Sequence, residues 1–242
     1  MKAVRVVKIV KACMQTSIAI IIPTLNEAEG LPKTLRLLQP LRQQGVELIV
    51  VDGGSVDTTL EAAQGLVDQW GVTSPGRANQ MNQGASLTTA DLLVFLHADT
   101  QLPEDAYQQL TTLPNKPHCW GRFNVRLDGS QWAFRLIERM MNWRSCITGV
   151  VTGDQVLFVT KSLFQQVGGF PSIALMEDIA ISKRLKKYAK PICLKSTVLT
   201  SSRRWQQHGI LRTVLLMWRC RLAYFFNVDP TALAKKYASR SH

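Results

Sequence analysis

Three short apolar runs decide the fold: SIAIIIP at 17–23, ELIVV at 47–51 and LLVFL at 92–96. Each run is continuous and contains Ile or Val, which is typical of a strand that is buried on both faces of a parallel sheet. Polar residues follow each run directly. The three runs therefore predict neighbouring strands of one buried sheet.

Helical spacing fills the segments between these strands. Leucines at 31, 35, 38 and 41 fall on one side of a helix over 31–41. Further helices are expected over 57–70 and 77–87, with a short strand around Val72 between them. Strands that alternate with helices at this spacing indicate an α/β fold with a mostly parallel sheet.

After Pro103 the pattern of elements changes. The expected elements are an extended segment over 118–130, helices over 132–143, 175–188 and 209–226, and strands over 156–160 and 191–199. No internal repeat and no linker rich in Pro, Gly or Ser interrupts them. We therefore expect one domain over 16–205, preceded by a basic extension over 1–15 and followed by a basic, apolar helical segment over 206–242.

The composition is that of an ordinary globular protein. The 242 residues are 46% hydrophobic and 19% charged, which excludes collagen, wholesale disorder and low complexity. The net charge of +12 is a C-terminal feature, because residues 183–242 hold 14 Lys or Arg and one acid. Such an end can contact phosphates, anionic lipid or nucleic acid. No nucleic-acid recognition motif accompanies the charge, so a nucleic-acid partner is not expected.

The five cysteines, at 13, 119, 146, 193 and 220, include no CxxC pair and fit no zinc spacing. Reduced, mostly buried thiols in a cytoplasmic protein are the expectation. Residues 1–15 carry four basic residues at intervals of three and so contain no apolar core of a secretory signal. They are a basic surface segment or lie before a start at Met14. No run of 18 uncharged apolar residues predicts a membrane-spanning helix.

The predicted strands end in polar residues. PTLNE at 23–27 follows the first strand, DGGSVDT at 52–58 the second, and HADT at 97–100 the strand at 92–96. Each group alone also fits a turn or a helix cap. In an open parallel sheet, however, ligands bind outside the carboxyl ends of the strands. Carboxylates gathered there repel one another unless they serve a cation or a polar ligand.

Five stretches together resemble a known family. They are IPTLNE at 22–27, VDGGSVDTT at 51–59, GRANQMNQGA at 76–85, FLHADT at 95–100, and GGFP with MEDIAISKRL at 168–185. In this order the chain is similar to the family 2 glycosyltransferases of GT-A fold, a Rossmann-like nucleotide-diphospho-sugar transferase fold, over about 17–205. GRANQMN, HADT, GDQ and SSRRW bring it nearest to the radical-SAM/selenodomain-associated transferase 2, or arsenosugar-biosynthesis, subgroup.

The resemblance implies a hexosyltransferase-like enzyme and a donor site. The implied nucleotide-sugar-binding residues are Pro23, Thr24, Asn26, Glu27, Asp52, Gly53, Ser55, Asp57, Arg77, His97, Ala98 and Asp99. Asp52 would accept hydrogen bonds from the base, and Arg77 would reach the base or the phosphates. The family's DxD motif binds Mn²⁺ or Mg²⁺, and here Asp99 would be the metal ligand. His97 stands where the family usually has the first Asp, so it would contact the sugar or a metal-bound water, unless it only packs at the strand end.

The resemblance also implies an acceptor side. Asp178, with Glu177 beside it, stands at the family's ED motif and would be the general base of an inverting transfer. First-turn acids also stabilise a helix without any catalytic role. Gly153, Asp154 and Gln155 would contact the acceptor or the sugar, or would form a turn. Of Arg203, Arg204 and Trp205, one arginine would lie near the diphosphate, unless these residues form a solvated basic loop.

Three readings of the helix over 209–226 stay open: a membrane-surface helix, a helix packed on its own domain, and a helix that pairs with a second chain. Arg212 and Arg219 fall on one face of it and Arg221 on the opposite face. The donor sugar, the base and the acceptor, lipid-linked or small, are unspecified. The alternatives to an active glycosyltransferase are a nucleotide-sugar-binding protein that has lost turnover and a sugar-phosphate nucleotidyltransferase, whose Gly-rich phosphate loop IPTLNEAEG lacks.

Overall fold

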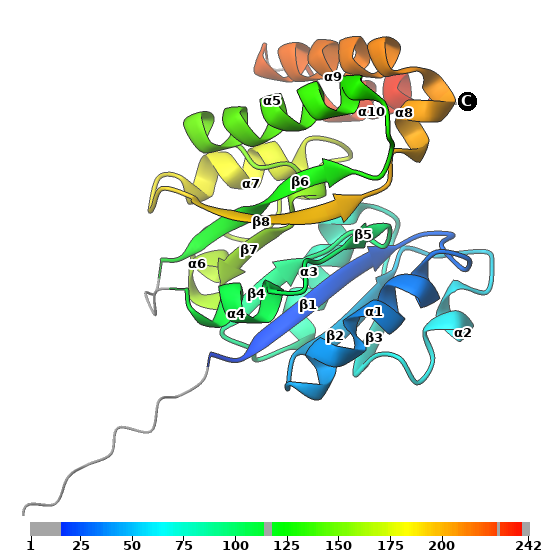
Figure 1. Cartoon of the computed structure of the whole chain (residues 1–242), viewed down its shortest axis with the longest axis vertical. Helices are drawn as coiled ribbons and strands as arrows, with labels where there is room; N and C mark the ends of the chain where they lie inside the picture. Colours follow the sequence, from blue (N-terminus) through cyan, green and yellow to red (C-terminus); the bar gives the residue numbers. More distant parts are fainter. Residues whose placement is uncertain (1–15, 114–117, 227, 239–242) are drawn as a thin grey trace, which may run out of the picture.

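The computed structural model of the chain describes residues 16–113, 118–226 and 228–238, so the expected extension over 1–15 lies outside the described residues. The described part forms one eight-stranded mixed sheet between helices (Figure 1). The strands are β1 (Ile18–Thr24), β2 (Glu47–Asp52), β3 (Gln69–Val72), β4 (Leu92–Phe95), β5 (Thr100–Gln101), β6 (Trp120–Leu127), β7 (Leu157–Thr160) and β8 (Ile192–Thr200).

The helices lie between and beyond these strands. They are α1 (Leu31–Gln43), α2 (Thr59–Ala63), α3 (Arg77–Leu87), α4 (Ala106–Thr111), α5 (Trp132–Thr148), α6 (Lys161–Gln166), α7 (Glu177–Leu185), α8 (Arg203–His208), α9 (Ile210–Phe225) and α10 (Pro230–Ala238), with a 3₁₀ turn η1 (Gly153–Gln155) before β7. The expected helices over 31–41, 77–87 and 209–226 therefore lie where the spacing predicts them.

The sheet has the order β3-β2-β1-β4-β7-β6-β8-β5. Strands β3, β2, β1 and β4 are mutually parallel, and β7 pairs antiparallel with β4. The register pairs Thr24 with Asp52 and Ile21 with Phe95. The polar ends of β1, β2 and β4 therefore meet at one edge of the sheet, as the sequence predicts.

Strand β1 is buried on both faces. Ile20 and Ile22 face one apolar cluster that contains Leu35 of α1, and Ile21 faces a second cluster that contains Met81 of α3. This alternation explains why the sequence shows a continuous apolar run rather than a period of two. The sheet is thus the middle layer of three.

Helix α3 packs closely against β1 because Gly84 has no side chain. A Cβ atom at Gly84 would overlap the Cγ2 atom of Ile21. The contact brings the first turn of α3, with Arg77, to the edge where β1 and β2 end.

The expected helix over 57–70 is wrong in its length. Helix α2 ends at Ala63, and Gly65 adopts a left-handed backbone conformation with φ of 74°. The chain then turns into β3, which pairs in parallel with β2. Asp68 holds this turn, because its Oδ2 accepts the Leu48 backbone N–H at 2.8 Å. A tertiary contact therefore overrides the local helical preference.

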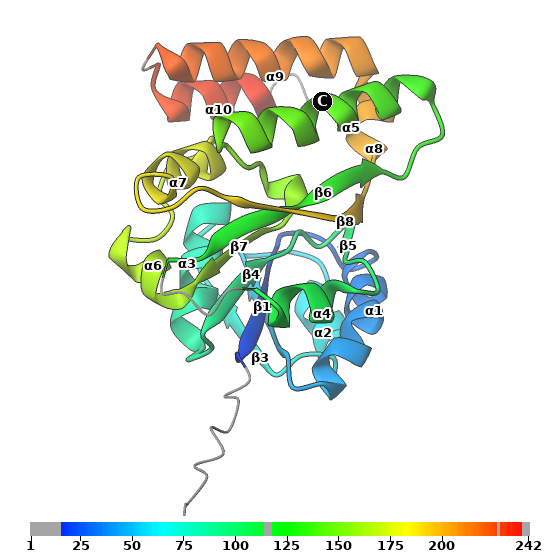
Figure 2. The same ribbon diagram turned by 60° about the vertical axis from the view of Figure 1, so that its left-hand side comes forward.

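The C-terminal helices pack against α5. Phe134 of α5, Trp205 of α8 and Leu127 of β6 form a small buried cluster, with Ile210 and Val214 of α9 against it. Figure 2 shows α9 and α5 side by side above β6 and β8. Among the described residues, no helix has both the length and the hydropathy that crossing a membrane requires.

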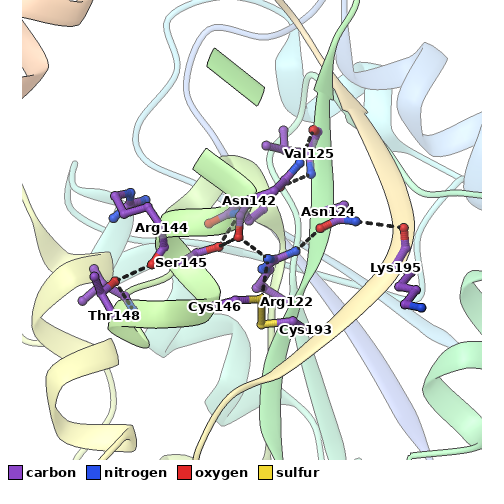
Figure 3. The surroundings of a disulfide bond; sticks show 12 residues. Arg122, Asn124, Val125, Asn142, Arg144, Ser145, Cys146, Thr148, Cys193 and Lys195 are labelled. Atoms are coloured by element: carbon purple, nitrogen blue, oxygen red, sulfur yellow. Dashed lines mark hydrogen bonds between the residues drawn. A yellow bond between two sulfur atoms is a disulfide. The ribbon is translucent and has the colours of Figure 1, made fainter. Parts of the chain in front are cut away.

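The expectation of reduced thiols is wrong for one pair. Cys146 of α5 and Cys193 of β8 form a disulfide across 47 residues of sequence, with Cα atoms 6.1 Å apart (Figure 3). The buried Arg122 lies beside it and donates from Nη2 to Cys146 Sγ at 2.9 Å. Cys119 and Cys220 are buried thiols, as expected. The pairing arises because α5 packs across β6 and β8, which no sequence spacing reveals.

Candidate functional site

A cavity of about 660 Å³ lies where β1 and β4 end, between the start of α7 and the inner face of α9. The cavity gathers many of the residues that the sequence singles out. They are Pro23, Thr24, Glu27, Arg77, His97, Ala98, Asp99, Gly153, Asp154, Glu177, Asp178, Arg203 and Trp205. Residues up to 182 positions apart in the chain therefore line one cavity.

Six other candidates do not line this cavity: Asn26, Asp52, Gly53, Ser55, Asp57 and Gln155. The seventh, Arg204, belongs to α8, and its side chain lies outside the described residues. Asn26 and Gln155 lie in segments that carry lining residues, whereas the other four lie at the end of β2 and in the loop after it, which contribute no lining residue.

Asp52 is 2% exposed and organises the loop after β2. Its Oδ2 accepts the backbone N–H groups of Gly54 and Ser55 at 2.9 and 2.7 Å, and its Oδ1 accepts the Ser55 hydroxyl. Three donors thus occupy the carboxylate, which is the Asx-type turn that Asp-Gly-Gly-Ser favours. Asp52 therefore stabilises its own loop.

Asn26 and Asp57 join the loops after β1 and β2. The Asn26 backbone N–H donates to Ser55 Oγ at 2.8 Å, and Asn26 Oδ1 accepts the Val56 N–H at 3.0 Å. Asp57 accepts the backbone N–H of Ala28 at 3.2 Å and the Thr59 side chain. The Thr59 hydrogen bond lowers the pKa of the exposed Asp57 carboxyl below its usual range. These contacts fix the two loops as one unit.

Glu177 is the buried partner of Arg77. The Arg77 Nε atom lies 3.3 Å from Glu177 Oε1. Burial raises the pKa of the Glu177 carboxyl above its ordinary 4.5, while the Arg77 charge opposes the rise and the Asp178 charge adds to it. Glu177 therefore aims the guanidinium of Arg77 at the cavity, a positioning role that first-turn helix acids alone do not imply.

Asp178 opens α7 and faces the turn η1. Its Oδ2 accepts the Gly153 N–H at 3.2 Å, and its Oδ1 accepts the Ile179 N–H at 2.7 Å. Met176, just before the helix, has a left-handed backbone with φ of 71°, which is uncommon for a residue with a side chain. This conformation turns the chain so that the first residues of α7 point into the cavity, and such outliers cluster at functional sites.

His97 packs at the end of β4 against η1. Its Nδ1 lies 3.6 Å from Asp154 Oδ1, and a Cβ atom at Gly153 would overlap its ring. Gly153 therefore holds the ring of His97 at the strand end, and the residue also lines the cavity.

Asp99 lies exposed on the cavity wall, beyond His97. Its charge reaches Glu27, where it adds to a rise in pKa whose main cause is burial and which the Arg203 charge opposes. A hard divalent cation prefers such carboxylate oxygens, so Asp99 fits the role of metal ligand. Within the described ranges no three His, Cys, Asp or Glu side chains gather as a complete metal site, so other oxygens would have to complete the shell.

Sequence reasoning missed two amides of α3 that shape the site. Gln80 is buried, and its Nε2 donates to the carbonyl oxygens of Thr24 at 2.6 Å and Val51 at 3.0 Å, which ties the ends of β1 and β2 together. Asn82 exchanges hydrogen bonds with the backbone N–H and C=O of Phe170. The GRANQMN motif contains both, and polar residues on the buried side of a helix were the available signal.

Sequence reasoning also did not identify the side of α9 that lines the cavity. Thr213, Met217, Cys220 and Arg221 line the cavity opposite the strand ends. Arg221 is the arginine that falls off the polar face of this helix, and its place in the cavity accounts for that exception. The signal was present in the sequence, but a helix with apolar residues on both sides does not reveal which side is covered.

Arg144 of α5 is a buried arginine that is close enough to Arg221 to be affected by its charge. The pKa of Arg144 is lowered to about 10, chiefly by burial and in part by the Arg221 charge, while the Asp178 charge opposes the shift. Its Nη2 atom is buried with no hydrogen-bond acceptor among the described residues, and Figure 3 shows its guanidinium pointing away from the Arg122 network. The charges of Arg221 and Asp178, which line the cavity, therefore both act on Arg144, which does not line it.

Comparisons with known proteins agree with this architecture. Residues 19–145 match the pattern of a family described as Glycosyl transferase family 2. A PGL/p-HBAD biosynthesis glycosyltransferase of Mycobacterium bovis is 40% identical over 166 residues, 63% of this chain and 62% of the relative. A 4,4'-diaponeurosporenoate glycosyltransferase of Staphylococcus haemolyticus is 41% identical over 96 residues, 36% of this chain and 25% of the relative. The match thus spans less than two thirds of these relatives' length.

Two solved structures share the fold. The mannosyltransferase PcManGT from Pyrobaculum calidifontis, in complex with GDP-Man and Mn²⁺, superposes with a TM-score of 0.60 at 19% identity, over 87% of this chain and 62% of that one. Glucosyl-3-phosphoglycerate synthase from Mycobacterium tuberculosis, in complex with Mn²⁺, UDP and phosphoglyceric acid, gives 0.55 at 17% identity, over 75% and 68%. These likenesses confirm the predicted GT-A-like fold.

Proposed function

The chain belongs to glycosyltransferase family 2, and from that premise we propose that it transfers a sugar from a nucleotide-diphosphate donor to a hydroxyl group of an acceptor. The observation that carries the proposal is the cavity of about 660 Å³ that brings Arg77, Asp99 and Asp178 together. A cation, a metal-binding carboxylate and a base are the groups that this reaction needs around the bond that breaks.

The donor occupies the strand-end side of the cavity in this proposal. Thr24 and Glu27 line the nucleoside pocket, while Asp52 acts through the loop that it holds. Arg77, aimed by Glu177, and Arg203, 4.0 Å from Glu27 Oε1, supply positive charge to the phosphates. We propose Arg204 as an alternative source of positive charge for the phosphates.

Asp99 would hold Mn²⁺ or Mg²⁺ together with oxygens of the donor diphosphate, and its exposed carboxylate supports this assignment. When bound, the ion supplies neutralisation of the charge that builds up on the departing diphosphate. His97 would contact the sugar or a metal-bound water, because its ring lines the cavity next to Asp99.

Asp178 is the proposed general base. Each of its oxygens accepts one backbone hydrogen bond, which leaves lone pairs for an acceptor hydroxyl. The carboxylate takes the hydroxyl proton as the oxygen attacks the anomeric carbon. The bond from that carbon to the diphosphate breaks, and its electron pair leaves with the diphosphate. A single displacement of this kind inverts the anomeric configuration.

The acceptor enters from the α9 side. Gly153 and Asp154, on the turn that donates to Asp178, and Trp205 border its path. Gln155 contributes indirectly, because it is buried and donates to Ser145 Oγ at 2.9 Å. Since residues of α8 and α9 line the cavity, we propose that the segment 206–242 completes the domain of 16–205. An anionic or lipid-linked acceptor is compatible with this path.

Two narrower statements belong to the same proposal. The motifs GRANQMN, HADT, GDQ and SSRRW favour the radical-SAM/selenodomain-associated transferase 2 subgroup. The basic C-terminal helix favours peripheral contact of a cytoplasmic enzyme with a membrane.

A donor screen tests the proposal. The full chain is incubated with Mn²⁺ or Mg²⁺, a panel of nucleotide sugars and hydroxyl acceptors, and release of nucleoside diphosphate is measured. We expect release with a restricted set of donors, and none from Asp178→Asn. Tight binding of a nucleoside diphosphate with no turnover on any donor would instead favour a nucleotide-sugar-binding protein.

A further inference from the structure

Helix α5 carries apolar side chains on two opposite faces. Phe134, Met141 and their neighbours are buried toward β6 and β8. The opposite face carries Trp132, Leu136, Met140, Trp143 and Ile147, with exposed fractions between 49% and 79%. Their spacing of three or four residues places them along one side of the helix. One of the two apolar faces of α5 therefore faces solvent.

Helix α9 repeats this arrangement. Its inner side packs on Phe134 and Trp205 and lines the cavity. Its outer side carries Leu211, Leu215, Trp218, Leu222 and Phe225, with exposed fractions between 55% and 73%. One side of α9 therefore covers its own domain, which is one of the three readings of this helix, and the other side is not covered by the described residues.

The two outer stripes belong to neighbouring helices. Ile137 of α5 and Met217 of α9 pack in the same cluster, and Figures 1 and 2 both place the helices side by side. Single exposed apolar residues are ordinary on a protein surface, but two neighbouring helices that each expose a stripe of five indicate an interaction site. We call these ten residues the two-helix face.

The exposed charges of helices α5 and α9 have one sign. Arg139, Arg212 and Arg219 are exposed on the same two helices. The acid of α5, Glu138, is buried and accepts the Leu127 N–H at 2.7 Å, and α9 contains no acid. A second copy docked on the same face by twofold symmetry would bring two positively charged faces together. An anionic lipid surface matches them instead.

We propose that the two-helix face docks on the surface of an anionic membrane, with its three tryptophans at the depth of the headgroups. Trp and Arg are the residues that membrane interfaces favour, and a helix with an apolar stripe lies in the plane of the interface. The inference rests on the proposed function and deepens it, because the other side of α9 lines the cavity. Docking would bring the acceptor entrance to the lipid surface.

Co-sedimentation of the full chain with vesicles tests the inference. Vesicles of phosphatidylcholine alone and with phosphatidylglycerol are compared at low and high salt. We expect binding to the anionic vesicles at low salt and weaker binding at high salt, because screening shortens the range of the surface potential. The double variant Trp143→Gln/Trp218→Gln should lower the partition coefficient at least about tenfold.

Trp70→Gln is the matched control, since Trp70 is 61% exposed on β3 at the opposite edge of the sheet. It should bind vesicles like the wild type. Absence of binding to anionic vesicles at low salt, or equal loss in the control, would overturn the inference. So would a dimer, seen by analytical ultracentrifugation, that the double variant dissociates. Vesicle binding by Asp178→Asn and donor turnover by the double variant are measured separately, so the two proposals can fail independently.

Discussion

The strand-end edge, formed by the loops after β1, β2 and β4, and the helical cover, formed by α5, α8 and α9, lie on two sides of one cavity. Different kinds of contact hold each of them. At the edge, Asp52 and Asp57 accept backbone N–H groups of their own loop, and Asp57 also accepts the N–H of Ala28 in the loop after β1. In the cover, the charge of Arg221 of α9 lowers the pKa of Arg144 of α5, and Met217 and Ile137 pack against the same buried cluster. Hydrogen bonds within and between loops preform the donor side, whereas the packing of helices creates the acceptor side.

The largest expected effect lies on the strand-end edge. Asp99→Ala should lower donor turnover about 10³-fold, the scale of charge stabilisation that a metal supplies. EDTA should inhibit the wild type in the same assay, and added Mn²⁺ or Mg²⁺ should restore it. Glu104→Ala removes an exposed carboxylate outside the cavity and should leave turnover unchanged. Full activity in EDTA would remove the metal from the donor side.

The next effect lies where the two regions meet. Asp178→Asn keeps the size of the side chain and an acceptor for the Gly153 N–H, but it cannot take a proton. Turnover should fall at least about 10²-fold with donor affinity little changed. Glu61→Gln, exposed on α2, is the control. A collapse of donor binding with turnover retained would assign Asp178 to the donor side.

A smaller effect is expected in the cover itself. Arg221→Gln should lower kcat/KM for the acceptor about tenfold, the scale of one charge-assisted hydrogen bond, while KM for the donor stays constant. Arg212→Gln changes the same residue type on the exposed side of α9 and should have no effect on either constant. If KM for the donor rises instead, Arg221 contacts the diphosphate and the two regions share the donor.

The smallest effect is a pH dependence. Burial raises the folded-state pKa of Glu177 above 4.5, so its contribution to stability is greatest below pH 4.5 and is lost as the pH rises through the raised value. In Glu177→Gln the free energy of unfolding, measured by urea denaturation, should therefore fall less over this range. Glu27 has a pKa raised by burial as well, so part of the fall should remain. An unchanged slope would mean that Glu177 has its ordinary pKa.

Much of the strand-end edge could be predicted from the sequence. The run SIAIIIP identifies β1 because a strand between two layers needs apolar side chains on both faces. The polar residues after β1, β2 and β4 meet because parallel strands end at the same edge. It was not predictable that Asp52 accepts hydrogen bonds from its own loop, since a carboxylate that binds a ligand and one that caps its own loop have the same sequence pattern.

By itself the sequence determined the α/β sheet, the edge at which polar residues gather, and the basic, apolar character of the C-terminal quarter. Only the tertiary structure decided that α9 turns Arg221 into the cavity, that α5 and α9 share an exposed face, and that Cys146 meets Cys193. The physical reason is one of range. Strand patterns and turns depend on neighbours in the chain, whereas a helix with two apolar sides is oriented by the surface against which it packs.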